Sequence, residues 1–333
     1  MSTSRCDSVV PRGERSTVMK RSDMADHHPP HAWVGPTLRR RGGFFLHGSD
    51  EDRGATTGAA WVQWEAPAQE EGQAAPVVLV HGGGGQSTDW MWAVDGQPGW
   101  AELFVGAGHP TYLLDRPGHG RSPWDPETMG GRGPIPDSAT LAGLFQIEEQ
   151  ELLPDARFAA VSASSTGLLS NAARAQATEA ERLIQLLDMV GPSIMVAHSA
   201  GAPGVWLAAD RAPHLVELVV AVEPLGPPFG GNRHAAALSE GVTAFPLNTS
   251  RCPENGRPQG LGQVPIVVVT AQASGHLGMD RETTAFLEDS ADDVEHLRLG
   301  EHGIDGDGHG VIFDANSTAA FHLLHSRYIR AGE

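Results

Sequence analysis

The stretch VAHSAG at residues 196–201 decides the fold, because it places a serine between two segments of different hydrophobic period. The apolar and β-branched run 192–196 predicts a buried strand, and the pattern 203–212 predicts a helix. Ser199 therefore stands at a sharp strand-to-helix turn between small neighbours, which is typical of a nucleophile elbow. Ala197 stands where this motif usually has its first glycine.

Apolar segments of strand and helix length continue on both sides of this turn. Two antiparallel strands are expected at 42–47 and 59–65, and short apolar runs predict further strands at 76–80, 110–115, 215–222, 264–270 and 294–299. Helical patterns recur at 175–190, 281–289 and 319–329. This alternation predicts an α/β fold with a mostly parallel central sheet flanked by helices.

The pattern also predicts how the chain is divided. Residues 1–33 are polar and charged, and we expect them to form a disordered N-terminal extension. Residues 34–333 are expected to form the α/β domain. Within it, residues 123–174 and 225–262 are rich in Gly and Pro and have no clean period, so we expect cap or lid insertions there.

Composition limits the classes of function. The net charge of −18 disfavours binding to nucleic acids and to anionic membranes. Lys20 is the only lysine, so no lysine is suitably placed for Schiff-base or P-loop chemistry. The two cysteines cannot build a disulfide framework. Without an evident secretory signal or membrane-length apolar run, we expect a cytoplasmic monomer or homodimer without metal or cofactor.

A glycine-rich motif, HGGGG at residues 81–85, follows a predicted strand. Such a loop lets backbone N–H groups approach a developing negative charge. We expect the amide of Gly83 or Gly84, together with the amide of Ala200, to form an oxyanion hole. A phosphate-binding loop is the alternative, but the G-x-G-x-x-G spacing with a following acidic residue is not convincingly present.

A serine nucleophile needs a base and an acid that orients the base, and in this arrangement the acid lies between the serine and the histidine in the chain. The strand 264–270 ends in AQAS without a carboxylate. The preceding strand ends at Glu223, which we therefore expect to be the acid. Asp280 is the alternative acid.

Two histidines follow the last predicted strand. His309 lies in the glycine-rich loop GDGHG, which can fold back over the elbow. His302 lies only three residues beyond Leu299. We expect His309 to be the base and keep His302 as the alternative.

Taken together, the motifs at 81–90, 115–122, 197–201, 222–224 and 308–316 resemble a bacterial esterase-like branch of the α/β-hydrolase superfamily. In that branch the triad acid is a glutamate after the sixth strand, 24 residues beyond the serine, and the same spacing separates Ser199 from Glu223 here. The resemblance spans about residues 35–330 and implies the α/β-hydrolase fold and ester hydrolysis. Some members carry cysteines in the oxyanion loop, where this chain has Gly83 and Gly84.

The expected function is therefore that of a serine hydrolase whose partner is a small-molecule ester or lactone. Ser199 would attack the carbonyl, His309 would take its proton, and Glu223 would orient the imidazole. The alternatives are a relative that cleaves another bond, such as an amide or C–C bond, and a non-catalytic binding protein on the same fold.

Overall fold

The computed structural model describes residues 38–50, 55–69, 74–94, 96–145, 161–227, 235–248 and 259–329. Thr37–Glu333 forms one compact unit. The expected N-terminal extension, both cysteines and parts of the two insertions (146–160, 228–234 and 249–258) lie outside the described residues.

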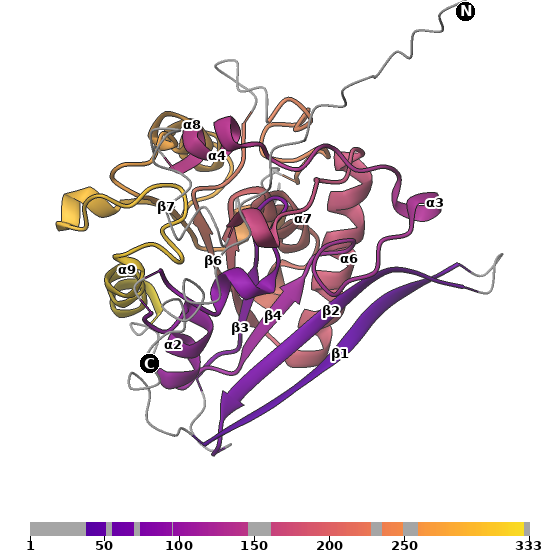
Figure 1. Cartoon of the computed structure of the whole chain (residues 1–333), viewed down its shortest axis with the longest axis horizontal. Helices are drawn as coiled ribbons and strands as arrows, with labels where there is room; N and C mark the ends of the chain where they lie inside the picture. The colour runs from indigo at the N-terminus through magenta and orange to yellow at the C-terminus, as the bar shows by residue number, and fades with distance from the viewer. Residues whose placement is uncertain are drawn as a thin grey trace, which may run out of the picture. The chain divides into compact units, whose positions relative to one another are not determined.

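A sheet of eight strands runs through the described residues (Figure 1). The strands are β1 (Arg39–Asp50), β2 (Ala55–Pro67), β3 (Val77–Val80), β4 (Thr111–Asp115), β5 (Ser193–His198), β6 (Val216–Val222), β7 (Ile266–Thr270) and β8 (Val294–Arg298). Their order is β1-β2-β4-β3-β5-β6-β7-β8. β1 pairs with β2 and β2 with β4 in antiparallel fashion, whereas all other pairs are parallel. The predicted α/β-hydrolase sheet is confirmed.

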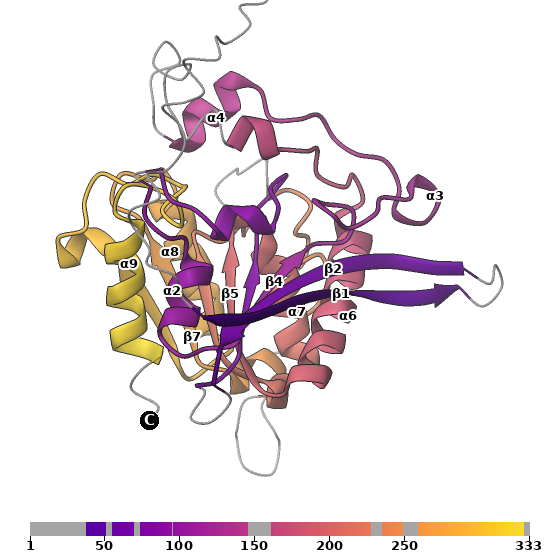
Figure 2. The same ribbon diagram turned by 60° about the horizontal axis from the view of Figure 1, so that its bottom comes forward.

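Helices cover both faces of this sheet. The longer ones are α2 (Trp100–Gly106), α4 (Ser138–Phe145), α6 (Ala172–Val190), α7 (Ala202–Arg211), α8 (Leu277–Glu288) and α9 (Ser317–Leu324), and α3 (Pro126–Met129) is a single turn. Figure 2 shows α2 and α9 on one side of the sheet and α6 and α7 on the other. Within the described residues, no helix is long and apolar enough to cross a bilayer.

Some boundaries differ from those expected. β1 and β2 extend beyond the predicted 42–47 and 59–65, because their register continues through polar residues up to Arg39 and Pro67. α8 begins at Leu277, four residues before the predicted start. The apolar pattern missed this first turn because Gly278 interrupts it. The predicted C-terminal helix becomes a π-helical turn at His325–Ile329.

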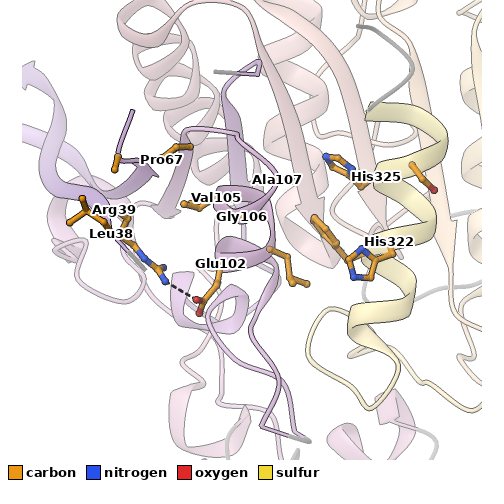
Figure 3. A pocket seen from close by; sticks show the side chains of 13 residues that line it. Leu38, Arg39, Pro67, Glu102, Val105, Gly106, Ala107, His322 and His325 are labelled. Carbon is orange, nitrogen blue, oxygen red and sulfur yellow. Dashed lines mark hydrogen bonds and ion pairs between the residues drawn. The ribbon is translucent and has the colours of Figure 1, made fainter. Parts of the chain in front are cut away.

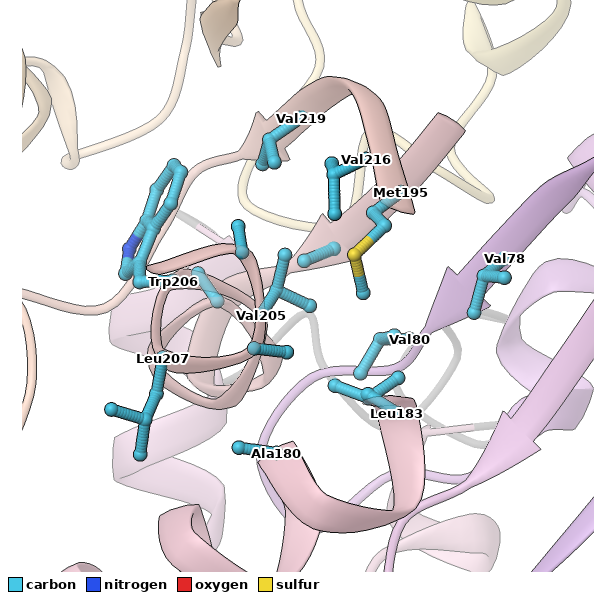
Figure 4. Close-up of a cluster of buried hydrophobic side chains, with 14 of the residues drawn as sticks. Val78, Val80, Ala180, Leu183, Met195, Val205, Trp206, Leu207, Val216 and Val219 are labelled. Atoms are coloured by element: carbon cyan, nitrogen blue, oxygen red, sulfur yellow. The ribbon is translucent and has the colours of Figure 1, made fainter. Parts of the chain in front are cut away.

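The core explains why the parallel strands read as continuous apolar runs. In β3, Val78 and Val80 pack into the cluster with α6 and α7, whereas Val77 and Leu79 pack into the cluster with α2 and α9. Figure 4 shows Leu183 of α6 and Val205 of α7 beside strand residues such as Met195. Each such buried side chain contributes about 1.5–3 kcal/mol, so both layers stabilise the sheet strongly.

The six parallel strands, β3 to β8, place their carboxyl ends along one edge of the sheet. Open α/β sheets bind ligands outside this edge. The segment with α3 and α4 lies beyond the same edge (Figure 2), and a bridge pairs Arg132, before α4, with Leu169, after it. The loops at the strand ends are therefore the place to look for a site.

Candidate active site

The turn after β5 has the geometry that its small residues predict. Ser199 has a φ of 49°, in the left-handed region that side chains rarely adopt. A Cβ on Gly201 would lie 2.5 Å from the carbonyl oxygen of His81, so the turn needs glycine there. Ala197 is fully buried within β5, where its methyl group is accommodated. The departure from the usual first glycine is therefore tolerated.

Three of the predicted residues meet at this turn. The Oγ atom of Ser199 lies 3.0 Å from Nε2 of His309. Nδ1 of the same ring lies 2.7 Å from Oε2 of Glu223. These contacts fit a ring that donates from Nδ1 to the carboxylate and accepts the serine hydroxyl at Nε2. Ser199, His309 and Glu223 thus form a continuous line, although 110 residues separate the serine from the histidine.

The two alternatives lie elsewhere. His302 is exposed in the short 3₁₀ helix Leu299–His302. Asp280 is fully buried and accepts a hydrogen bond from Oγ1 of Thr270 at 2.6 Å. In the described part of the chain it is therefore Glu223, not Asp280, that bonds to His309.

The end of β7, where the sequence offers no carboxylate, holds the carboxylate of the neighbouring strand. The backbone N–H of Ala271 donates to Oε1 of Glu223 at 2.8 Å, and the hydroxyl of Ser274 donates to Oε2 at 2.9 Å. Glu223 itself has a φ of 47°. Such a backbone conformation costs free energy and persists only where the surrounding structure imposes it. The network thus fixes the acid at a strained strand end.

Burial controls the charges of this line. Burial raises the pKa of Glu223 to about 7, against the opposing effects of His276, the Ala271 amide and the Ser274 hydroxyl. Burial also lowers the pKa of His309 to about 4, so its imidazole is neutral at neutral pH. A neutral imidazole is the form that can take a proton from a hydroxyl group.

Two further histidines contact His309, and the sequence analysis assigned neither of them. His198, just before the serine, donates from Nε2 to the carbonyl oxygen of His309 at 2.8 Å. Burial lowers the pKa of His198 to about 3 and keeps it neutral. The ring of His276 stacks on that of His309, with centroids 4.1 Å apart and an angle of 22° between the planes. Only the position of His198 beside Ser199 could have signalled such a contact.

The glycine-rich loop after β3 runs directly along the elbow. A Cβ on Gly82 would lie 2.7 Å from Nδ1 of His198, and one on Gly83 would lie 3.2 Å from Cβ of Ala200. The missing side chains therefore let the loop backbone approach the turn. Gly83 and Ala200 are neighbours, as two amides that serve the same oxyanion would have to be.

Gly84 is held differently. It has a φ of +67°, and its carbonyl oxygen accepts a hydrogen bond from the backbone N–H of Thr166 at 2.7 Å. Thr166 belongs to the segment expected to be a cap. This segment and the glycine-rich loop are thus tied together.

A buried network holds the start of the loop. Nε2 of His81 accepts from the backbone N–H of Arg116 at 3.0 Å, and Nη1 of Arg116 donates to the carbonyl oxygen of Gly82 at 3.1 Å. The guanidinium also forms a buried ion pair with Glu179 of α6, with Nε and Oε2 2.9 Å apart. The segment after Asp115 thus supports the glycine-rich loop.

The line of three residues opens into a cavity of about 430 Å³. The apolar residues that line it include Ile135, Leu141, Leu144, Leu168, Leu225 and Phe313. Gly83, Gly84 and Ala200 line it too. None of its described lining residues is Arg or Lys. Two carboxylates, those of Asp89 and Asp137, line it as well. The cavity therefore suits an apolar group without negative charge next to Ser199.

A second cavity, of about 730 Å³, lies between α2, α9 and the ends of β1 and β2 (Figure 3). Arg39 reaches across it to Glu102, with Nη2 and Oε1 2.6 Å apart. None of the predicted catalytic residues lines it.

One group of described residues has the side chains to hold a metal. Ligand atoms of Glu223, His276 and His309 all lie within 4.8 Å of one another. Both ring nitrogens of His309 already contact Glu223 and Ser199. A metal bound by either nitrogen would therefore break that contact, so we assign no metal to the site.

Comparison with known proteins decides the family. Residues 75–242 match the model of the α/β-hydrolase fold family. The chain belongs to this family. The match contains the glycine-rich loop, Ser199 and Glu223, whereas His309 lies beyond it.

Two curated proteins and one solved structure show the extent of the similarity. The chain is 30% identical to a probable secreted lipase, phiG, of a fungal species over 295 residues, which cover 75% of this chain and 80% of the relative. It is 33% identical over 128 residues to the esterase Rv0045c of Mycobacterium tuberculosis, and this match covers 38% of this chain and 37% of that esterase. The solved structure of a bacterial esterase is 17% identical in sequence, and the match covers 89% of this chain and 98% of the esterase chain with a TM-score of 0.65. This last likeness concerns the fold. Because the fungal lipase is described as secreted, the cytoplasmic location stays a prediction.

Proposed function

We propose that this α/β hydrolase cleaves carboxylic esters or lactones through a Ser199–His309–Glu223 triad and an acyl-enzyme intermediate. The observation that carries the proposal is the line of hydrogen bonds from Ser199 through His309 to Glu223, which opens into an apolar cavity. The lipase and esterase relatives support ester bonds as the substrate class.

The steps follow from the contacts. His309 accepts the hydroxyl proton as Ser199 Oγ attacks the carbonyl carbon, and the resulting imidazolium lies against the Glu223 carboxylate. The oxyanion accepts hydrogen bonds from the amide of Ala200 and that of Gly83 or Gly84. His309 then gives its proton to the leaving alcohol. Water, activated by the same imidazole, releases the acid and restores Ser199. No step calls for a cofactor.

The proposal also covers the domain organisation of the chain. We assign the hydrolase domain to residues 34–333 and expect the cap or lid insertions, 123–174 and 225–262, to determine substrate size. With Glu223 after β6 as the triad acid, the proposal also assigns the chain to the esterase-like branch that its motifs resemble.

The test is intact-mass labelling with a fluorophosphonate probe, together with p-nitrophenyl esters from acetate to decanoate. Wild-type protein should gain one adduct and hydrolyse the esters. Ser199→Ala should lose the adduct and lower kcat by at least about 10³-fold, since removing the nucleophile leaves only binding and oxyanion stabilisation.

Ser164→Ala is the matched control, because Ser164 lines the same cavity but its hydroxyl bonds to Val161. It should label like wild type. Folded wild-type protein with neither adduct nor turnover would overturn the proposal and favour a binding protein on this fold.

A further inference from the structure

His276 lies against the proposed base but belongs to a different strand connection. Its ring stacks on the His309 ring at 4.1 Å and 22°. His309 comes from the loop after β8, whereas His276 is the last residue before α8. The side chain is half-buried and lines the cavity of Ser199. Its ring is therefore a direct neighbour of the His309 ring inside the cavity.

The backbone of His276 is tied to the acid. Its N–H donates to Oγ of Ser274 at 3.1 Å, and the same hydroxyl donates to Oε2 of Glu223 at 2.9 Å. One hydroxyl group thus fixes the carboxylate that orients His309 and the residue that stacks on its ring. The contact with His309 is consequently part of the same network as the Glu223 hydrogen bond.

The stacking restricts a motion that hydrogen bonds alone permit. His309 bonds to Glu223 and Ser199 through its two nitrogens, and both bonds lie along the edge of the ring. A ring held at its edge can still tilt about the line between its partners. Offset stacking prefers parallel planes and adds about 0.5–1.5 kcal/mol to an aromatic pair, so it opposes such a tilt. A misplacement of about 1 Å can cost 10²-fold in rate.

We propose that His276 is a positioning residue, which holds the ring plane of His309 in line with Ser199 and the substrate carbonyl. The inference rests on the proposed function of His309. The required property is the flat aromatic face of His276; its nitrogens take no proton in the reaction. A phenylalanine ring at this position should therefore preserve the function of His276, whereas alanine should not.

The kinetic test compares His276→Ala and His276→Phe on p-nitrophenyl butyrate. His276→Ala should lower kcat by about 10- to 10²-fold and change KM less than threefold, since the ring is misaligned while the cavity remains. His276→Phe should return kcat to within threefold of wild type. His302→Ala, which changes an exposed histidine on the neighbouring loop, is the matched control and should match wild type.

A spectroscopic test is independent of turnover. The Nδ1 proton of His309, bonded to Glu223, should give a low-field proton resonance at neutral pH. The resonance should broaden or vanish in His276→Ala and persist in His276→Phe and His302→Ala. An unchanged resonance in all three variants would overturn the inference.

The outcomes separate the two proposals. Unaltered kcat in His276→Ala, or equal losses in the alanine and phenylalanine variants, overturns the positioning role while the wild-type ester hydrolysis still supports the triad. An effect confined to KM assigns His276 to substrate binding and also overturns it. Wild-type protein that hydrolyses no ester removes both proposals together.

Discussion

The two sides of the cavity around Ser199 are built on different principles. On the sheet side, Ser199, Glu223 and His309 come from the connections that follow β5, β6 and β8 and are linked by hydrogen bonds of 2.7–3.0 Å. On the side of residues 133–168, the lining consists largely of apolar side chains, and Ile135 and Leu168 are 60% and 42% exposed. A polar network fixes atoms to within tenths of an ångström, whereas apolar contact fixes only volume. We therefore expect the first side to determine rate and the second to determine which ester fits.

The largest effect on the sheet side is expected for Glu223→Gln. The amide can present N–H groups to Nδ1 of His309 and favour the wrong tautomer, so kcat should fall by about 10²- to 10⁴-fold with little change in KM. Steady-state kinetics on p-nitrophenyl butyrate measure this loss. Glu288→Gln, at an exposed position on α8, is the control. A loss below threefold would instead point to an acid other than Glu223.

The ion pair that supports the glycine-rich loop should contribute strongly to the free energy of unfolding. Glu179→Ala leaves the buried guanidinium of Arg116 without its ion-pair partner, so the free energy of unfolding should fall by about 3–5 kcal/mol. Urea denaturation followed by circular dichroism measures it. The exposed pair Arg327–Glu295 is the matched comparison, and Glu295→Ala should cost under about 1 kcal/mol. Equal effects of the two variants would contradict this distinction.

The pH dependence of kcat/KM tests the charges on the sheet side. The reaction needs neutral His309, whose pKa burial lowers to about 4, and ionised Glu223, whose pKa burial raises to about 7. Both forms are the deprotonated ones, so activity should rise with pH and reach its plateau above about 7. The acid limb should lie between about 4 and 7. A profile that is flat from pH 4 to 8 would exclude this charge assignment.

The smallest effect is expected on the apolar side. Leu168 lines the cavity, and its Cδ2 would lie 3.4 Å from a Cβ on Gly83. Leu168→Ala should raise KM for p-nitrophenyl octanoate about 3- to 10-fold and leave kcat for the acetate unchanged, because removed methyl groups weaken only the contact with a long chain. The ester series measures both. If kcat for the acetate falls instead, the apolar side also positions the reacting groups.

Much of the site could be predicted because its main residues sit at the ends of recognisable strands. The run into Ser199, the strand ending at Glu223 and the glycine-rich loop around His309 each have a local signature in the sequence. The parallel sheet then brings such strand ends to one edge. The family model and the sheet order confirm the fold that these patterns predict.

The supporting residues have no such local signature. Ser274 follows β7 in a stretch that the sequence shows only as lacking a carboxylate, and Thr166 lies in a segment without clear period. Their roles arise because β6 and β7 are adjacent and because Thr166 returns to Gly84. Buried Asp280 shows the converse: it is near enough to Glu223 for that carboxylate to help raise its pKa, although burial is the larger cause, yet it bonds to Thr270.

The sequence by itself determined the class of fold and the order of serine, acid and histidine along the chain, because hydrophobic period and turn chemistry act over a few residues. Only the tertiary structure decided between His309 and His302 and between Glu223 and Asp280 as hydrogen-bond partners. It also placed His276 against the ring of His309. These contacts depend on which loops lie close together in space. The contact between Ser199 and His309, 110 positions apart, is determined by the packing of the whole sheet.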